Sequence, residues 1–182
     1  RAPTAAFAPI CSLPELETWF VTWTFSETIH SRSYTHIIRN IYSNPSKIFD
    51  EIMDIQEIVD CAKDISKHYD QLLFFNTTQT AIPKTYLNSP DAQKNHKKAL
   101  WMALMSVNIL EGVRFYVSFA CSWAFAEVKK MEGNAKIIGL IARDESQHLV
   151  ITQNIINKWR EGDDPDILQI AKEEEQNVID MF

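Results

Sequence analysis

The chain has 182 residues, of which 46% are hydrophobic and 23% charged, and its net charge is −6. This composition is ordinary for a globular protein and allows one domain with a sizeable core. The acidic balance and the lack of a basic patch argue against a nucleic-acid-binding protein, which usually carries a basic face. The longest apolar stretch, Leu100 to Met105, is much shorter than a membrane span, and no signal peptide is visible.

The three cysteines, Cys11, Cys61 and Cys121, lie far apart and form no Cys-x-x-Cys pair. Neither a disulfide framework nor a zinc knuckle is indicated, so we expect a reducing, cytoplasmic setting. The sequence starts at Arg1 without Met and ends at Phe182 inside a predicted helix. We therefore interpret it as a single domain, residues 1–182, that is truncated at both ends.

Only four glycines occur and long segments lack proline, so the predicted fold is all-α. Residues 1–13 are predicted to be extended, because they contain Pro3 and Pro9. A helix should then begin at Pro14, with glutamates in its first turn, and run to about Asn44, before the next proline. The remaining predicted elements are a helix over 46–75, a loop over 76–90, a helix over 92–131 closed by Glu132 and Gly133, a helix over 134–161 capped by Gly162, and a last helix from Asp163 or Asp164. Together they predict an antiparallel helical bundle.

Two Glu-x-x-His motifs, Glu27 with His30 and Glu145 with His148, fall on separate predicted helices. Residues three apart are neighbours on a helix, so each motif presents a carboxylate and an imidazole on one face. A third helix supplies Glu111 inside an apolar run, where an unpaired acid is costly to bury. One such motif alone is a common coincidence. Two of them on separate helices around a buried glutamate indicate a metal site.

A di-iron carboxylate bundle uses a lone carboxylate from each of two helices and a Glu-x-x-His from each of the other two. This chain contains both pairs and one of the two lone carboxylates. Carboxylates with imidazoles suit iron or manganese, and the sequence does not decide between them. The other histidines, His36, His68 and His96, lack such partners, and we assign them surface or core roles.

Tyr34 lies four residues after His30 and therefore shares the helical face of that motif, one turn further on. Three apolar side chains stand at similar helical spacings from the other predicted ligands: Phe115, Phe119 and Ile141. Taken singly, each fits a packed core. Around a tyrosine beside a metal site, they predict a dry cage in which an oxidised phenol would persist.

Several segments closely resemble the small subunit of bacterial and phage class Ia ribonucleotide reductases, a ferritin-like di-iron family. The segments are PELETW at 14–19, FSETIHSRSYTHIIRN at 25–40, RFYVSFACS at 114–122, and MEGNAKII followed by LIARDE and His148 within 131–148. The resemblance extends over nearly the whole chain and is weakest between about 54 and 98. Runs this long are far more specific than the Glu-x-x-His spacing.

The resemblance implies a ligand set for two oxo-bridged irons, namely Glu27, His30, Glu111, Glu145 and His148. It implies that Tyr34 carries a stable radical and that Phe115, Phe119 and Ile141 line the radical pocket. It also implies that Asp144 hydrogen-bonds the His30 imidazole and belongs to the electron-transfer route, whereas a surface acid is the plainer interpretation. Tyr116 matches a position near the site, but we assign it no role.

The resemblance further implies a ribonucleoside-diphosphate reductase, in which the radical passes to a large catalytic subunit that reduces ribonucleotides to deoxyribonucleotides. The family forms homodimers; no nucleic-acid or membrane partner is expected. One Asp ligand, a relay Trp and a C-terminal docking tail of the family are expected outside this chain. The 182 residues alone are therefore expected to bind metal weakly and to be inactive.

Two alternatives remain open from the residues alone. A di-iron oxygenase would need an open apolar substrate cavity where Tyr34 and its cage are predicted. A ferritin-like iron-storage protein, or a bundle whose site has decayed, would assemble differently and would have no reason to keep Tyr34 dry.

Overall fold

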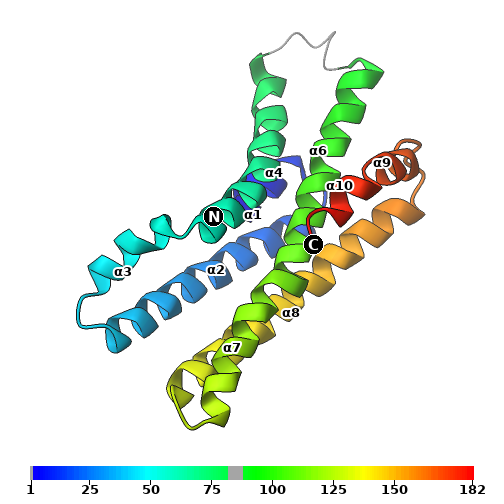
Figure 1. Cartoon of the computed structure of the whole chain (residues 1–182). Coiled ribbons are helices and arrows are strands. Elements are labelled where there is room, and N and C mark those ends of the chain that lie inside the picture. Colours follow the sequence, from blue (N-terminus) through cyan, green and yellow to red (C-terminus); the bar gives the residue numbers. More distant parts are fainter. Residues whose placement is uncertain (1, 82–87) are drawn as a thin grey trace. The chain divides into compact units, whose positions relative to one another are not determined.

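The computed structural model describes residues 2–81 and 88–182, and within these residues all regular structure is helical (Figure 1). The all-α prediction is therefore confirmed. The chain divides into two compact units, which are described separately. The first unit contains residues 1–66 and 118–144, and the second contains residues 67–117 and 145–182. The prediction of a single domain over 1–182 stays a prediction.

The first unit begins with a short helix that packs against the long helix carrying the first Glu-x-x-His motif. Its elements are α1 (Ala2–Phe7), η1 (Ala8–Ile10), α2 (Pro14–Ile41), α3 (Pro45–Glu51), η2 (Ile52–Asp54) and the start of α4 (Gln56–Ala81). Its core is an aromatic stack in which the Phe20 ring lies between Phe7, at 5.4 Å, and Trp23, at 6.4 Å. Trp23 is fully buried, which fixes one face of α2 against α1.

The predicted extended segment over 1–13 is wrong, because most of it is helical. Pro3 is the second residue of α1 and Pro9 the second residue of η1. Proline lacks an N–H, but the first turn of a helix needs none, so both prolines are compatible with these helices. Only Cys11 to Leu13 separate η1 from α2.

The second predicted helix, 46–75, differs in two ways from the structure. It is interrupted after Asp54, where Ile55 adopts an extended backbone with φ −88° and ψ 103°. It also continues as α4 to Ala81, so residues 76–81 are helical rather than part of a loop. The Thr77 hydroxyl donates to the carbonyl oxygen of Leu73, which satisfies this side chain within the helix. The rest of the predicted loop, over 82–87, lies outside the described residues.

The third predicted helix, 92–131, consists of three consecutive elements. They are α6 (Pro90–Ile109), the π-helical segment η3 (Leu110–Arg114) and α7 (Phe115–Glu127). Helix α8 (Glu132–Glu161) follows, so Glu132 and Gly133 start this helix instead of closing the previous one. Both α7 and α8 continue from one unit into the other.

The end of α7 is a Schellman turn built without glycine. The backbone N–H of Lys130 donates to Phe125 O and that of Lys129 to Ala126 O, each at 2.9 Å. Lys129 has a positive φ of 59°, and Met131 one of 53°. Non-glycine residues rarely adopt this conformation, which the turn imposes here.

In the second unit, α6 packs against α9 (Ile167–Glu173) and α10 (Glu175–Ile179). The last predicted helix therefore begins at Ile167, three residues later than expected from Asp164. The reason is that the Asp164 carboxylate accepts from the backbone N–H of Asp166 and holds a turn before the helix. The Nζ atom of Lys97 on α6 lies 2.7 Å from a carboxylate oxygen of Asp164 and 2.7 Å from one of Asp166. These two ion pairs hold the turn against α6.

One continuous helical stretch, Pro90–Glu127, is long and apolar enough to cross a membrane by length and composition only. About 44% of its most apolar window is buried within the protein. The core helix of a soluble protein passes the same test, so this stretch is weak evidence for a membrane span.

Candidate metal centre

Glu111 lies in the only π-helical segment of the described residues, η3, and its side chain is 3% exposed. A π turn contains one residue more than an α turn, so it changes the direction in which the following side chains point. The sequence predicted an ordinary helix here, because the run around Glu111 is apolar at most positions and does not reveal a one-residue shift in its periodicity. Such turns are frequent at functional sites.

The second motif forms as predicted on α8, where Glu145 and His148 are each 2% exposed. The Nδ1 atom of His148 lies 2.7 Å from Glu145 Oε2 and 3.7 Å from Glu111 Oε2. One ligand atom from each of these three residues lies within 4.8 Å of the others. The structure therefore brings together three of the five predicted ligands in the second unit.

The chemistry of this cluster fits a metal ion. Two carboxylates buried side by side repel each other and lose their hydration, which is costly without a compensating cation. In the absence of metal, an N–H of His148 can donate to Glu145 at the observed distance. A divalent cation would replace that proton, because a ligating imidazole is neutral.

The first motif forms in the other unit, on α2. The Nδ1 atom of His30 lies 3.8 Å from Glu27 Oε2, and the imidazole is 3% exposed. The opposite ring atom, Nε2, lies 3.0 Å from Asp144 Oδ2. Since a carboxylate only accepts, Nε2 carries the proton and Nδ1 presents its lone pair on the side of Glu27. This is the arrangement expected of a metal-binding histidine held by an acid.

Two neighbours of the first motif were not predicted from the sequence. The indole Nε1 of buried Trp23 donates to Glu27 Oε1 at 2.9 Å, which orients this carboxylate. The Ser26 hydroxyl lies 3.3 Å from His30 Nε2 and 3.4 Å from Asp144 Oδ2. Both residues stand one helical turn before the ligand they approach, and this spacing is the signal that identifies them in the sequence.

Tyr34 and the residues of its predicted cage differ in exposure. Tyr34 is 39% exposed, although Phe119 and Ile141 of the same unit are buried, at 1% and 3%. Phe115 belongs to the other unit and is half-buried. Tyr34 lies one turn beyond His30 on α2, among residues that are themselves exposed or half-buried. The radical pocket stays a prediction.

The remaining histidines have the surface and core roles that the sequence predicted. His36 is exposed, and His68 is buried with 6% exposure. His96 stacks on Phe75 with ring centroids 6.0 Å apart, and its Nε2 lies 2.8 Å from Asn76 Oδ1. Burial lowers the pKa of His96.

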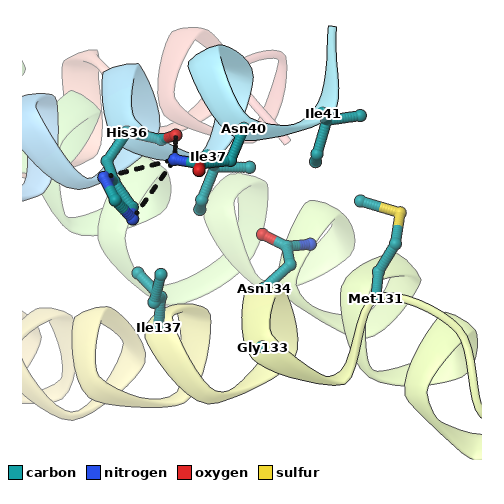
Figure 2. A pocket seen from close by; sticks show the side chains of 8 residues that line it. All are labelled: His36, Ile37, Asn40, Ile41, Met131, Gly133, Asn134 and Ile137. Carbon is teal, nitrogen blue, oxygen red and sulfur yellow. Dashed lines mark hydrogen bonds between the residues drawn. The ribbon is translucent and has the colours of Figure 1, made fainter.

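A pocket of about 310 Å³ lies in the first unit, and no predicted ligand lines it (Figure 2). Side chains of α2 face the turn before α8 and the first turns of that helix across it. Its lining residues are His36, Ile37, Asn40, Ile41, Met131, Gly133, Asn134 and Ile137. None of them was predicted to bind metal or to carry chemistry.

Comparison with known proteins gives a consistent result. A family model described as "Ribonucleotide reductase, small chain" matches residues 4–182. The ribonucleoside-diphosphate reductase subunit beta of Haemophilus influenzae is 53% identical, and the ribonucleoside-diphosphate reductase 1 subunit beta of Escherichia coli O157:H7 is 52% identical. The corresponding protein of Enterobacteria phage T4 is 44% identical.

Each of these three alignments covers 100% of this chain but only 50% or 51% of the relative. The chain therefore spans about half the length of the curated relatives it matches. Because the family model matches almost the entire sequence, the chain belongs to the ribonucleotide reductase small-chain family.

Proposed function

We propose that this chain supplies the metal-binding and radical-forming residues of the small subunit of an aerobic ribonucleoside-diphosphate reductase. The observation that carries the proposal is the buried cluster of Glu111, Glu145 and His148, whose ligand atoms lie within 4.8 Å of one another. A decayed bundle would have no reason to keep two buried carboxylates adjacent, because their desolvation is costly. The family relationship favours the reductase over an oxygenase or a storage protein.

We further propose that Glu27 and His30 complete the same centre and that it holds two irons, with manganese as an alternative that the same ligands accept. With metal bound, the centre would use dioxygen to remove one electron from the Tyr34 phenol. Asp144 keeps the proton of His30 on Nε2, so that Nδ1 remains available. Trp23 holds the Glu27 carboxylate through its indole N–H.

The oxidised tyrosine would lose its phenolic proton and then pass the radical equivalent to a cysteine of a separate large subunit. That subunit would bind the nucleotide and carry out the ribose chemistry, since the described residues offer no glycine-rich phosphate loop. Because Tyr34 is 39% exposed, we propose that the assembled enzyme covers it, as a phenoxyl radical reached by reductants is short-lived. Assembly as a homodimer in the cytoplasm belongs to the same proposal.

The test uses the protein with whatever flanking sequence its gene encodes, loaded with ferrous iron in air. We expect close to two irons per chain and a tyrosyl signal in electron paramagnetic resonance. Tyr34→Phe should abolish the signal and keep the iron. Tyr42→Phe is the matched control, because Tyr42 lies at the end of the same helix and is 47% exposed. A tyrosyl signal that persists in Tyr34→Phe would refute the assignment.

A further inference from the structure

A polar link between a half-buried asparagine and a buried threonine joins α6 to α8 beside the candidate metal centre. Thr152 of α8 is 0% exposed, and its hydroxyl lies 2.9 Å from the carbonyl oxygen of His148 and 3.0 Å from that of Leu149. The Nδ2 atom of Asn108 on α6 donates to the same hydroxyl oxygen at 2.8 Å. Asn108 also lies 3.3 Å from the carbonyl oxygen of Leu149. One threonine thus connects the backbone of α8 to a side chain of α6.

Each residue of this link stands about one helical turn from a predicted metal ligand in its own stretch of helix. Asn108 precedes Glu111 by three residues, and Thr152 follows His148 by four. Asn108 is also the penultimate residue of α6, directly before the π-helical segment that carries Glu111. It is therefore the last side chain tied to α8 by a hydrogen bond before the backbone changes its path.

Apolar packing alone sets the axial position of these two helices less sharply than a directional contact does. The hydrophobic effect is non-directional, so a slide of one helix on the other changes it little. A slide by one residue moves Glu111 by about 1.5 Å along the axis. Metal–ligand distances tolerate deviations of only about 0.2 Å. A directional contact therefore adds a restraint on the distance from Glu111 to the Glu145 and His148 pair.

The burial of this link also points to a positioning role. Burying the Thr152 hydroxyl costs more than burying an apolar side chain of the same size, unless its hydrogen bonds compensate. At the same level, the Leu149 side chain of α8 packs closely against Gly112 of the π-helical segment. A Cβ atom added to Gly112 would lie 2.9 Å from Leu149 Cδ1.

We propose that Asn108 and Thr152 are positioning residues that fix the axial register of α6 against α8 and thereby the geometry of the Glu111, Glu145 and His148 cluster. The inference rests on the proposed metal centre. It concerns side chains that bind no metal themselves and act only through the backbone of the ligand-bearing helix.

The test measures cobalt(II) binding, by competition with a chelator and by the visible spectrum of the bound ion, in the protein with its gene-encoded flanking sequence. Thr152→Val keeps the shape and removes the hydroxyl. We expect its affinity to fall on the order of tenfold, with an altered cobalt spectrum, as for other residues that orient metal ligands. Thr152→Ser keeps the hydroxyl and should restore both readouts. Asn108→Leu should reproduce the Thr152→Val result.

Matched controls are Thr18→Val and Asn154→Ala, which remove equivalent side-chain bonds to backbone carbonyl oxygens at exposed positions. We expect both to bind cobalt as the unmodified protein does. The double variant Asn108→Leu with Thr152→Val should bind no more weakly than either single variant, because both changes break one link. Should Thr152→Val fail to fold, Asn108→Leu and Thr152→Ser give the same comparison.

The outcomes separate this inference from the function on which it rests. If the unmodified protein binds cobalt but Thr152→Val and Asn108→Leu bind it with unchanged affinity and spectrum, the positioning role is overturned and the metal centre stands. If the unmodified protein binds no cobalt, the metal centre itself is overturned, and the positioning role with it.

Discussion

The His30 imidazole is joined to the Asp144 carboxylate by a 3.0 Å contact between Nε2 and Oδ2, although the two residues are 114 positions apart in the sequence. The imidazole is almost completely buried, whereas the Asp144 side chain is 46% exposed. The acid therefore reaches a buried ring from the edge of the protein. Because the Asp144 side chain is half-exposed, its charge can be removed without disturbing the buried residues around His30. A substitution at Asp144 therefore tests how the first motif holds its histidine.

We expect Asp144→Asn to weaken metal binding by roughly tenfold to a hundredfold while leaving the fold intact. The amide is a poorer acceptor than a carboxylate and its NH₂ group competes for the same position, so Nε2 is held less firmly as the protonated nitrogen. Cobalt affinity and the thermal midpoint of the metal-free protein provide the two measurements. Asp163→Asn changes an exposed acid and serves as the control. An unchanged affinity would show that Asp144 does not orient His30.

We expect Glu111→Gln to stabilise the metal-free protein and to abolish its stabilisation by metal. The change removes one of two buried neighbouring charges, which should raise the free energy of unfolding by about 1 kcal/mol or more. In the unmodified protein, metal at a hundred times its dissociation constant should add about 2.7 kcal/mol. Thermal unfolding with and without cobalt measures both effects.

The control for that change is Glu127→Gln, at an exposed position of α7, which should behave as the unmodified protein. A Glu111→Gln variant that loses stability without metal would show that this carboxylate is held by compensating contacts, and would remove the physical argument for a cation at the cluster.

The metal ligands within each helix were predictable because they depend only on helical spacing. Glu145 and His148 meet on one face of α8 for the reason that positions three apart always do. The partner of Thr152 was not predictable, because spacing does not say which residue of another helix lies opposite. The π turn at Glu111 was missed because the run around it is apolar at most positions, so a one-residue shift in its periodicity is not visible in the sequence.

Helix ends were predicted less well than helices. Proline at position 3 suggested an extended segment, yet a proline in a first turn is compatible with a helix. The end of α7 was predicted four residues late because its stop signal, usually a glycine, is here Lys129. The exposure of Tyr34 shows a further limit, since a shared helical face does not determine how much of it other elements cover.

We expect the link between Lys97 and Asp164 to make stability pH-dependent on the acid side. Burial by itself raises the pKa of Asp164, but hydrogen bonds from Lys97 and Trp159 outweigh it and hold the pKa below its usual value of 3.8. The unfolded chain then binds the proton more readily than the folded one. The contribution of this carboxylate is therefore complete above its unfolded pKa and is lost as the pH falls through the lower folded pKa.

Urea unfolding of the unmodified protein and of Asp164→Asn, from neutral pH down to below the usual aspartate pKa, measures this contribution. At neutral pH the variant should be less stable by roughly 1–2 kcal/mol. The difference between the two proteins should shrink as the pH falls. A difference that stays constant throughout would mean that the charge of Asp164 does not contribute. Asp163→Asn, at the exposed neighbouring position, should show no such pH dependence.

We expect Lys129→Gly to stabilise the protein by about 0.5–1 kcal/mol. Lys129 has a φ of 59°, a left-handed conformation that costs a residue with a Cβ about 1–2 kcal/mol. Glycine avoids this cost but gains freedom in the unfolded chain, which offsets about 0.4–1 kcal/mol. The ion pair of Lys129 with Glu132 spans 3.9 Å between two exposed side chains, so its loss matters little. Lys130, the next residue, does not have a positive φ, so Lys130→Gly relieves no such cost and should destabilise the protein. Urea midpoints of the two variants decide the matter: if Lys129→Gly is the less stable of the two, the Schellman turn does not strain this residue.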